Sequence, residues 1–329
     1  MLCRCFIVSP PAVLRLRCRA PPKQRYLLDV GFPSPSQAWI GGIRAGSGAS
    51  CGNHVKASCR WVAFNAEAAG VLGIVPLECK DGGKRTVSQL CCHSDAVTDF
   101  DFSPFDQLLL ATGSADETVK VWRLPESGQD MPSGAGLTLG PGGGPVDVLQ
   151  FHPTADGILA SGAGKQVTVW DVGQQQPLTA LDSHGDQLQS LAWKRDGRLL
   201  GTSCKVSGSG NSDSRVSCAL QSVMGHENNK DSRLLWMGSS DCLISVGFSQ
   251  MREREVKLWD TRRFSRAMLT VALDTSPGCR ISPELLAKCR DGGTLAAHRA
   301  VLVAGWDAGA GWVVGSRRVR IRGLWQGAE

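Results

Sequence analysis

The sequence predicts an all-β protein, assembled from repeated sheets of short antiparallel strands. The clearest copy covers residues 93–122 and reads HSDAVTDFDFSPFDQLLLATGSADETVKVW. Alternating runs lie around Val97 and Val119, and turn signals at 103–104 and 113–116 separate the apolar stretches. Period-two alternation is typical of half-buried strands, and Pro and Gly clusters mark the turns between them. Three such strands make most of one blade of a β-propeller.

The pattern returns along the chain, which makes it a repeat. Further copies start near Gly142, His184 and His226, with a spacing of about 42 to 49 residues. The last copy closes on the residues VKLWD, at 256–260. This period, with Gly-His near one end and Trp-Asp at the other, is typical of the WD repeat. The sequence therefore predicts a WD-repeat β-propeller with about five recognisable blades of an expected seven, and it leaves closure of the ring open.

The chain divides into three segments. We predict that residues 1–38 are a disordered basic leader, because they are rich in Arg, Pro and Cys and show no periodicity. A mitochondrial presequence is the alternative, although the prolines oppose its amphipathic helix. Residues 279–329 form a divergent tail rich in Gly, Ala and Arg, in which no repeat survives. Between them lies the propeller, residues 39–278, with blades at about 39–92, 93–143, 144–183, 184–225 and 226–278.

Two blades depart from the repeat. The first blade, with strands expected at about 59–64, 70–77 and 87–91, lacks the Trp-Asp ending. The fourth blade starts well, but residues 206–218 read VSGSGNSDSRVSC where a closing strand is expected. A tract of Ser, Gly and Asn is typical of a linker and does not supply a buried strand. An altered transcript is one hypothesis for these abrupt losses of the pattern.

Composition excludes several classes of function. The net charge of +6 is mild and its basic excess lies mainly at the two ends of the chain, so nucleic-acid binding is not expected. The sequence has no run of 18 apolar residues, so no membrane span is predicted. The thirteen Cys contain no CxxC pair, which favours reduced thiols in a cytoplasmic protein over a disulfide scaffold or a metal site. The Gly-rich stretch 140–144 has no phosphate-loop motif, and we expect no cofactor.

The repeated His predicts a polar network inside each blade. The opening His can hydrogen-bond a Ser or Thr on the middle strand and the turn Asp, with the Trp indole joining the chain. The same residue types could form a hydrolytic triad, but a catalytic triad does not recur in every blade, so we expect a structural network and no enzyme. The predicted members are His93, Thr112 or Ser114, Asp116, Trp122, His184, His226 and Trp259.

Several stretches resemble one family, the coronins. Residues 247–260, GFSQMREREVKLWD, look like the fifth-blade signature of that family, and 273–278, LDTSPG, are similar to the segment that follows it. Ile43-Arg44, Asn53-His54 and 70–77 resemble coronins as well. The sequence of residues 93–122 is more similar to the long coronins, which have two tandem propellers, than to the short ones. The resemblance covers about 39–204 and 224–278.

The resemblance implies a scaffold that binds actin filaments, organises the cytoskeleton and acts in Golgi and post-Golgi vesicle traffic. It places the protein in the cytoplasm, with cytoskeletal and Golgi association. The family's filament-binding Arg matches Arg44. The tetrapeptide WDTR, with Asp260 and Arg262, resembles the box by which WD-repeat proteins dock onto a cullin ubiquitin ligase, so a ligase substrate adaptor is an alternative function. A truncated form without function is the other alternative, because blades and a second propeller are missing from the pattern.

Overall fold

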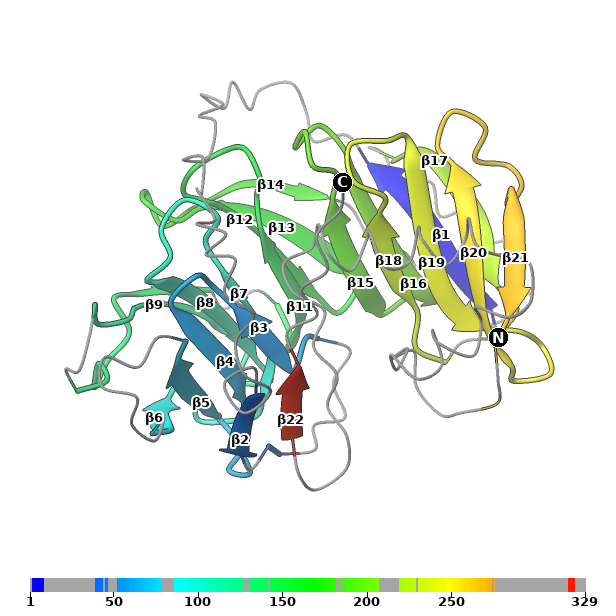
Figure 1. Cartoon of the computed structure of the whole chain (residues 1–329). Coiled ribbons are helices and arrows are strands. Elements are labelled where there is room, and N and C mark those ends of the chain that lie inside the picture. The colour runs from blue at the N-terminus through cyan, green and yellow to red at the C-terminus, as the bar shows by residue number, and fades with distance from the viewer. Residues whose placement is uncertain are drawn as a thin grey trace.

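The computed structural model describes residues 2–8, 39–43, 45–46, 52–77, 86–126, 130–140, 143–181, 184, 186–206, 219–228, 230–273, 275 and 319–322. Every regular element in these ranges is a β-strand (Figure 1). Accordingly, this part of the chain contains no helix of the length and hydropathy needed to cross a bilayer. The predicted all-β fold class is confirmed.

Among the described residues, four of the five blades are continuous in sequence, and each is a four-stranded antiparallel sheet whose strands follow chain order. Blade one consists of β3 (Val55–Ala57), β4 (Trp61–Asn65), β5 (Val71–Pro76) and β6 (Ser88–Cys91). Blade two consists of β7 (Val97–Phe102), β8 (Leu109–Ser114), β9 (Val119–Arg123) and β10 (Leu137–Leu139). Blade three consists of β11 (Val146–Phe151), β12 (Ile158–Ala163), β13 (Gln166–Asp171) and β14 (Gln176–Leu181). Blade five consists of β18 (Arg233–Trp236), β19 (Cys242–Phe248), β20 (Arg254–Asp260) and β21 (Leu269–Ala272).

Blade four takes one strand from the other end of the sequence. Its sheet has the order β15-β16-β1-β17, where β15 is Leu188–Trp193, β16 is Leu200–Val206, β17 is Ala219–His226 and β1 is Leu2–Val8. In Figure 1 the blue arrow of β1 lies among the green and yellow strands of blades four and five. The third place of this blade, which the sequence left empty at 206–218, is therefore filled by the first strand of the chain.

The prediction of a disordered leader over 1–38 is wrong for residues 2–8. The seven residues LCRCFIV carry no Pro or Gly and are mainly apolar, so they can form a buried strand once a sheet offers them two edges. That partner is about 200 residues away in sequence and does not show in a local pattern. Residues 9–38 lie outside the described part of the chain.

A second pairing joins the two end segments. Strand β2 (Trp39–Ile43) pairs antiparallel with β22 (Val319–Arg322) and not with the sheet of blade one. The prediction placed 39–43 in blade one and expected no blade from the tail, and the structure gives the tail one strand of a two-stranded sheet. The other residues of 276–329 lie outside the described ranges.

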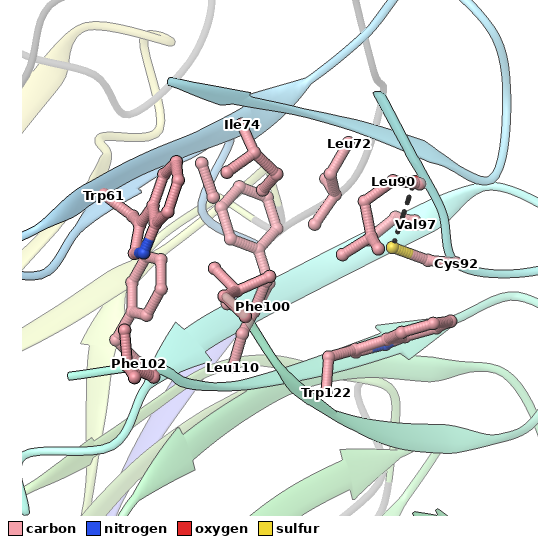
Figure 2. Close-up of a cluster of buried hydrophobic side chains, with 13 residues drawn as sticks. Trp61, Leu72, Ile74, Leu90, Cys92, Val97, Phe100, Phe102, Leu110 and Trp122 are labelled. Atoms are coloured by element: carbon pink, nitrogen blue, oxygen red, sulfur yellow. Dashed lines mark hydrogen bonds between the residues drawn. The ribbon is translucent and has the colours of Figure 1, made fainter. Parts of the chain in front are cut away.

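In the described part of the chain, four hydrophobic cores lie between successive blades. Blades one and two enclose the cluster drawn in Figure 2, in which Trp61, Leu72 and Ile74 of blade one face Phe100 and Leu110 of blade two. Blade two packs in the same way on blade three, blade three on blade four, and blade four on blade five. Because each sheet has an apolar residue pattern on both faces, a blade is buried only by its neighbours.

Side chains of the inner strands also bind the backbone of the next blade. We call Asp99, Asp101, Gln150 and Ser190 the inner-strand acceptors. They accept hydrogen bonds from the amide groups of Leu149, Phe151, Trp193 and Leu234, respectively, at 2.8 to 3.0 Å. Each bond joins two successive blades, from blade two to blade five. At the far end of the row, Arg233 Nη2 of β18 donates to the carbonyl of Gly52, beside blade one, at 3.1 Å.

Asp99 makes the most of these contacts. Its Oδ1 accepts from the amide and the side chain of Asn53 at 2.7 and 3.0 Å, while its Oδ2 accepts from the Leu149 amide at 2.8 Å. One carboxylate on blade two therefore joins blades one, two and three. Burial raises the pKa of Asp99, and the hydrogen bonds from Asn53 and Leu149 oppose that rise.

We expect Asp99→Ala to lower the free energy of unfolding by about 1–3 kcal/mol, because the buried amide of Leu149 loses its acceptor. The measurement is urea unfolding of the full chain at neutral pH, followed by tryptophan fluorescence. Glu126→Ala is the control, since Glu126 is exposed on the surface of blade two. Equal stability of the two variants would show that the inner-strand acceptors do not hold the blades together.

Candidate functional site

Blade two contains a complete polar relay, which we define as the chain of hydrogen bonds from a Trp indole through a hydroxyl and a His to a carboxylate. Trp122 Nε1 donates to Thr112 Oγ1 at 3.0 Å, and Thr112 Oγ1 lies 2.8 Å from His93 Nε2. The Nδ1 atom of His93 lies 2.9 Å from Asp116 Oδ2. All four groups are satisfied when the imidazole is neutral, with its proton on Nδ1 and the Thr112 hydroxyl donating to Nε2.

The strand geometry explains why these residues meet. Thr112 lies on β8 opposite Lys120 of β9, so Trp122 lies one strand period further along the same face. The turn after β8 carries Asp116 back toward His93, which precedes β7. Of the two predicted hydroxyls, Thr112 is the relay member. Ser114 instead donates to the Asp95 carbonyl at 3.2 Å and accepts from the Asp116 amide at 3.1 Å, which fixes the turn.

A second complete relay, with a different acid, joins His226 at the end of β17 to blade five. Trp259 Nε1 donates to Ser245 Oγ at 2.8 Å, and Ser245 Oγ lies 2.9 Å from His226 Nε2. His226 Nδ1 lies 2.8 Å from Glu255 Oε1. The carboxylate comes from strand β20 and not from a turn, and it also pairs with Lys257 Nζ at 3.0 Å.

Blades three and four contain parts of the relay. In blade three, Trp170 Nε1 donates to Ser161 Oγ at 2.8 Å. In blade four, His184 Nε2 lies 2.9 Å from Thr202 Oγ1, and its Nδ1 lies 3.3 Å from the Lys165 carbonyl. The third strand there is β1, which supplies no Trp; the ring of Phe6 meets His184 edge-on, with 5.2 Å between centroids.

Burial keeps the relay histidines neutral. Desolvation lowers the pKa of His93 and of His226, against the opposing influence of Asp116 and Glu255. It lowers the pKa of His184 to about 4. Burial would raise the pKa of Asp116, but the hydrogen bonds from Thr118 and His93 outweigh it and the pKa is lowered. The imidazoles of His93 and His226 have no exposed side-chain surface, so the relays offer a substrate no access and act as supports for the turns.

Several polar contributors were not named from the sequence, among them the relay residues Ser161, Trp170, Thr202 and Ser245, and three others are more informative. Glu255 shares a face of β20 with Lys257 and Trp259, and that two-residue alternation was the signal that could have identified it. His54 Nδ1 lies 3.2 Å from Asn65 Oδ1, which gives blade one a His contact without a repeat motif. Asp99 lies in the alternating run of β7, where its burial depends on blades one and three.

The two predicted surface sites have different outcomes. Arg44 lies outside the described residues, although Gly46, two residues further on, donates its amide to the Asn65 carbonyl of blade one at 3.0 Å. Arg262 lies in the turn after β20, with its side chain 72% exposed. Its Nε and Nη2 donate to the two carboxylate oxygens of Asp260 at 3.0 and 2.9 Å. The hydrogen bonds from Arg262 hold the pKa of Asp260 at about 2.

The described residues contain no group of three or more His, Cys, Asp or Glu side chains that could hold a metal ion. Chemically, the arrangement offers buried supports and an exposed, oriented guanidinium.

Comparisons with known proteins agree with this architecture. Residues 84–123 match the family model "WD domain, G-beta repeat", and residues 30–81 match "Domain of unknown function (DUF1899)". The chain is similar to Coronin-7 of Bos taurus, with 62% identity over 242 residues, covering 73% of this chain and 26% of that protein. It is 58% identical to Coronin-7 of Homo sapiens over 250 residues, covering 76% of this chain and 27% of that protein. The chain thus spans about a quarter of the length of these relatives.

A solved structure gives the same picture. The WD40 domain from Toxoplasma gondii coronin superposes with a TM-score of 0.62 and 27% identity, covering 73% of this chain and 63% of that one.

We expect stability to fall as pH is lowered from 6.5 toward 4, and His184→Gln to remove part of that fall. The folded-state pKa of His184, about 4, lies below the unfolded value near 6.5, so the unfolded chain takes up its proton first. The contribution of His184 to the free energy of unfolding is complete above pH 6.5. About 2 kcal/mol of it is lost by pH 5.

The measurement is the urea midpoint of the wild type and of His184→Gln at pH 7 and pH 5. A smaller loss between the two pH values is expected for the variant. An identical loss in both proteins would mean that His184 is not held neutral in blade four.

Proposed function

Because the chain belongs to the coronin family of WD-repeat propellers, we propose that it is a non-enzymatic scaffold that binds actin filaments. The observation that carries the proposal is the 62% identity to a coronin over 242 residues. The five stacked blades of the structure support it. The resemblance of the opening blades to the long coronins extends the proposal to Golgi and post-Golgi vesicle traffic. The proposed location is the cytoplasm, with association to the cytoskeleton and to vesicles of Golgi origin.

Arg44 is the proposed filament contact. Its neighbours Ala45 and Gly46 lie against blade one, where Ala45 packs on the apolar cluster around Phe64 and the Gly46 amide binds Asn65. A cation that precedes such an anchored backbone in the sequence suits a partner surface of negative charge, since long-range charge attraction speeds association.

We expect the full chain to co-sediment with actin filaments and Arg44→Ala to weaken that binding about tenfold, because a loss of one charged contact of about 1.4 kcal/mol changes affinity by that factor. The measurement is the fraction pelleted against filament concentration at low and physiological salt. Arg60→Ala, which removes an exposed Arg from the same blade, is the matched control. Unchanged binding by Arg44→Ala would place the contact elsewhere, and an equal loss in both variants would show a general effect of charge. No pelleting of the unmodified chain would favour the alternative of a shortened form without filament binding.

Docking onto a cullin ubiquitin ligase is the second candidate function. The observation that favours it is the exposed side chain of Arg262, which Asp260 holds in one orientation through two hydrogen bonds. A guanidinium fixed in this way loses little conformational entropy when it binds a partner.

We expect Arg262→Ala to abolish co-precipitation of the ligase's adaptor subunit with the full chain, while Arg263→Ala leaves it unchanged. Arg263 is its exposed neighbour in the same turn and carries the same charge. Unchanged capture by Arg262→Ala would remove this candidate and leave the filament proposal untouched.

A further inference from the structure

Blade four contains a gap between two of its own strands that a separate segment fills. Strands β16 and β17 each pair antiparallel with β1, so they run parallel to one another with β1 between them. The register with β16 is unbroken from Leu2 opposite Val206 to Val8 opposite Leu200. The two flanking strands therefore present hydrogen-bonding edges to one extended peptide, which is the geometry of strand addition to a sheet.

Both faces of the inserted strand are buried, against two different blades. Phe6 and Val8 are part of the core between blades three and four, while Cys5 and Ile7 are part of the core between blades four and five. The exposed fraction of Cys3, Cys5, Phe6, Ile7 and Val8 is 2% or less. The gap thus recognises side chains on both faces and not only backbone.

The gap restricts the residue at position 5 to a small one. A side chain on Gly225 of β17 would meet Cys5 Sγ at 2.4 Å, so the two residues fit only because Gly225 has none. A larger residue in place of Cys5 would collide with β17 in the same way. Position 7 lies opposite Gly201 of β16, which leaves room beside the branched side chain of Ile7.

Two further contacts select residue type. Cys3 Sγ donates to Ser232 Oγ at 3.1 Å, and Ser232 in turn lies 2.8 Å from Ser203 Oγ of β16. This favours a small hydrogen-bond donor at position 3. Phe6 meets the ring of His184 edge-on at an interplanar angle of 88°, which favours an aromatic residue at position 6.

We propose that the gap between β16 and β17 is a peptide-binding site and that residues 2–8 are its resident, exchangeable ligand. The site takes an extended segment with a small hydrogen-bond donor at its second position and a small residue two places further on. An aromatic residue and two branched residues follow. Residues 9–38 separate β1 from β2, and a chain of that number of residues can span up to about 100 Å, so chain length does not prevent exchange of β1. Retention in the same molecule follows from the high effective concentration of a tethered segment.

The test uses a directed disulfide in the full chain. Val223 of β17 lies directly opposite Cys5, whereas Ser222 lies opposite Phe6 and projects from the other face of the sheet. Val223→Cys should therefore form a disulfide with Cys5 when the two thiols give their protons and two electrons to diamide. Ser222→Cys is the matched control and should not. Peptide mapping by mass spectrometry identifies the bond, and a non-reducing gel shows whether it joins one molecule or two.

Exchange is tested by adding a biotinylated peptide of residues 1–9 with Cys3→Ser, which keeps a donor at position 3 and leaves one thiol. When this peptide is added in large excess before diamide, its thiol and the thiol introduced by Val223→Cys should form a disulfide, with their protons and two electrons passing to the diamide. The yield should fall at least tenfold for the same peptide with Phe6→Asp. Absence of the peptide adduct, beside a complete disulfide between Cys5 and the introduced thiol, would overturn exchange. Disulfide-linked dimers would overturn the claim that residues 2–8 occupy the gap of their own molecule. Equal yields from both peptides would overturn the claim that the gap selects an aromatic residue at position 6.

Discussion

No blade of this protein can bury both of its faces alone, and that constraint governs the whole structure. Each four-stranded sheet carries apolar residues on both sides, so its stability depends on the sheets before and after it. Two interactions meet this need together. The cores between successive blades remove apolar surface from water, and the inner-strand acceptors satisfy backbone amides at the same interfaces. A substitution that disrupts one blade therefore also lowers the stability of both neighbouring blades.

Blade four shows how strict the constraint is. In its described sheet the third place is taken by β1, and without that strand the cores on both sides would be open at their centre. Strand β1 supplies Phe6 and Val8 to one core and Ile7 to the other. Burial of each such side chain contributes about 1.5–3 kcal/mol, in proteins whose total stability is about 5–15 kcal/mol. One seven-residue strand thus decides whether blades three to five remain a continuous row.

The sequence could predict whatever depends on local pattern. The alternation in 97–102 and 119–123 gave β7 and β9, and the repeated His placed two relays whose members the structure brings together. It could not predict β1, because the partners of the residues LCRCFIV, β16 and β17, are about 200 residues away and do not show in a local pattern. Glu255 was missed for a related reason: the acid in blade two comes from a turn, while in blade five it comes from a strand. Only the fold shows that Asp116 reaches His93 and that Glu255 reaches His226 at the end of β17.

The ends of the row are where the constraint is met least completely. The four cores between the described blades each draw on two blades, but the cluster of Val62, Phe64 and Val75 draws on blade one and its flanking residues, and that of Ile244 and Val256 draws on blade five and its flanks. Several members of both clusters are only partly buried. The proposed filament contact follows β2 and adjoins the first cluster through Ala45. Blade one, against which Ala45 packs, is in turn held by blade two through Asp99, Lys56 and the core of Figure 2.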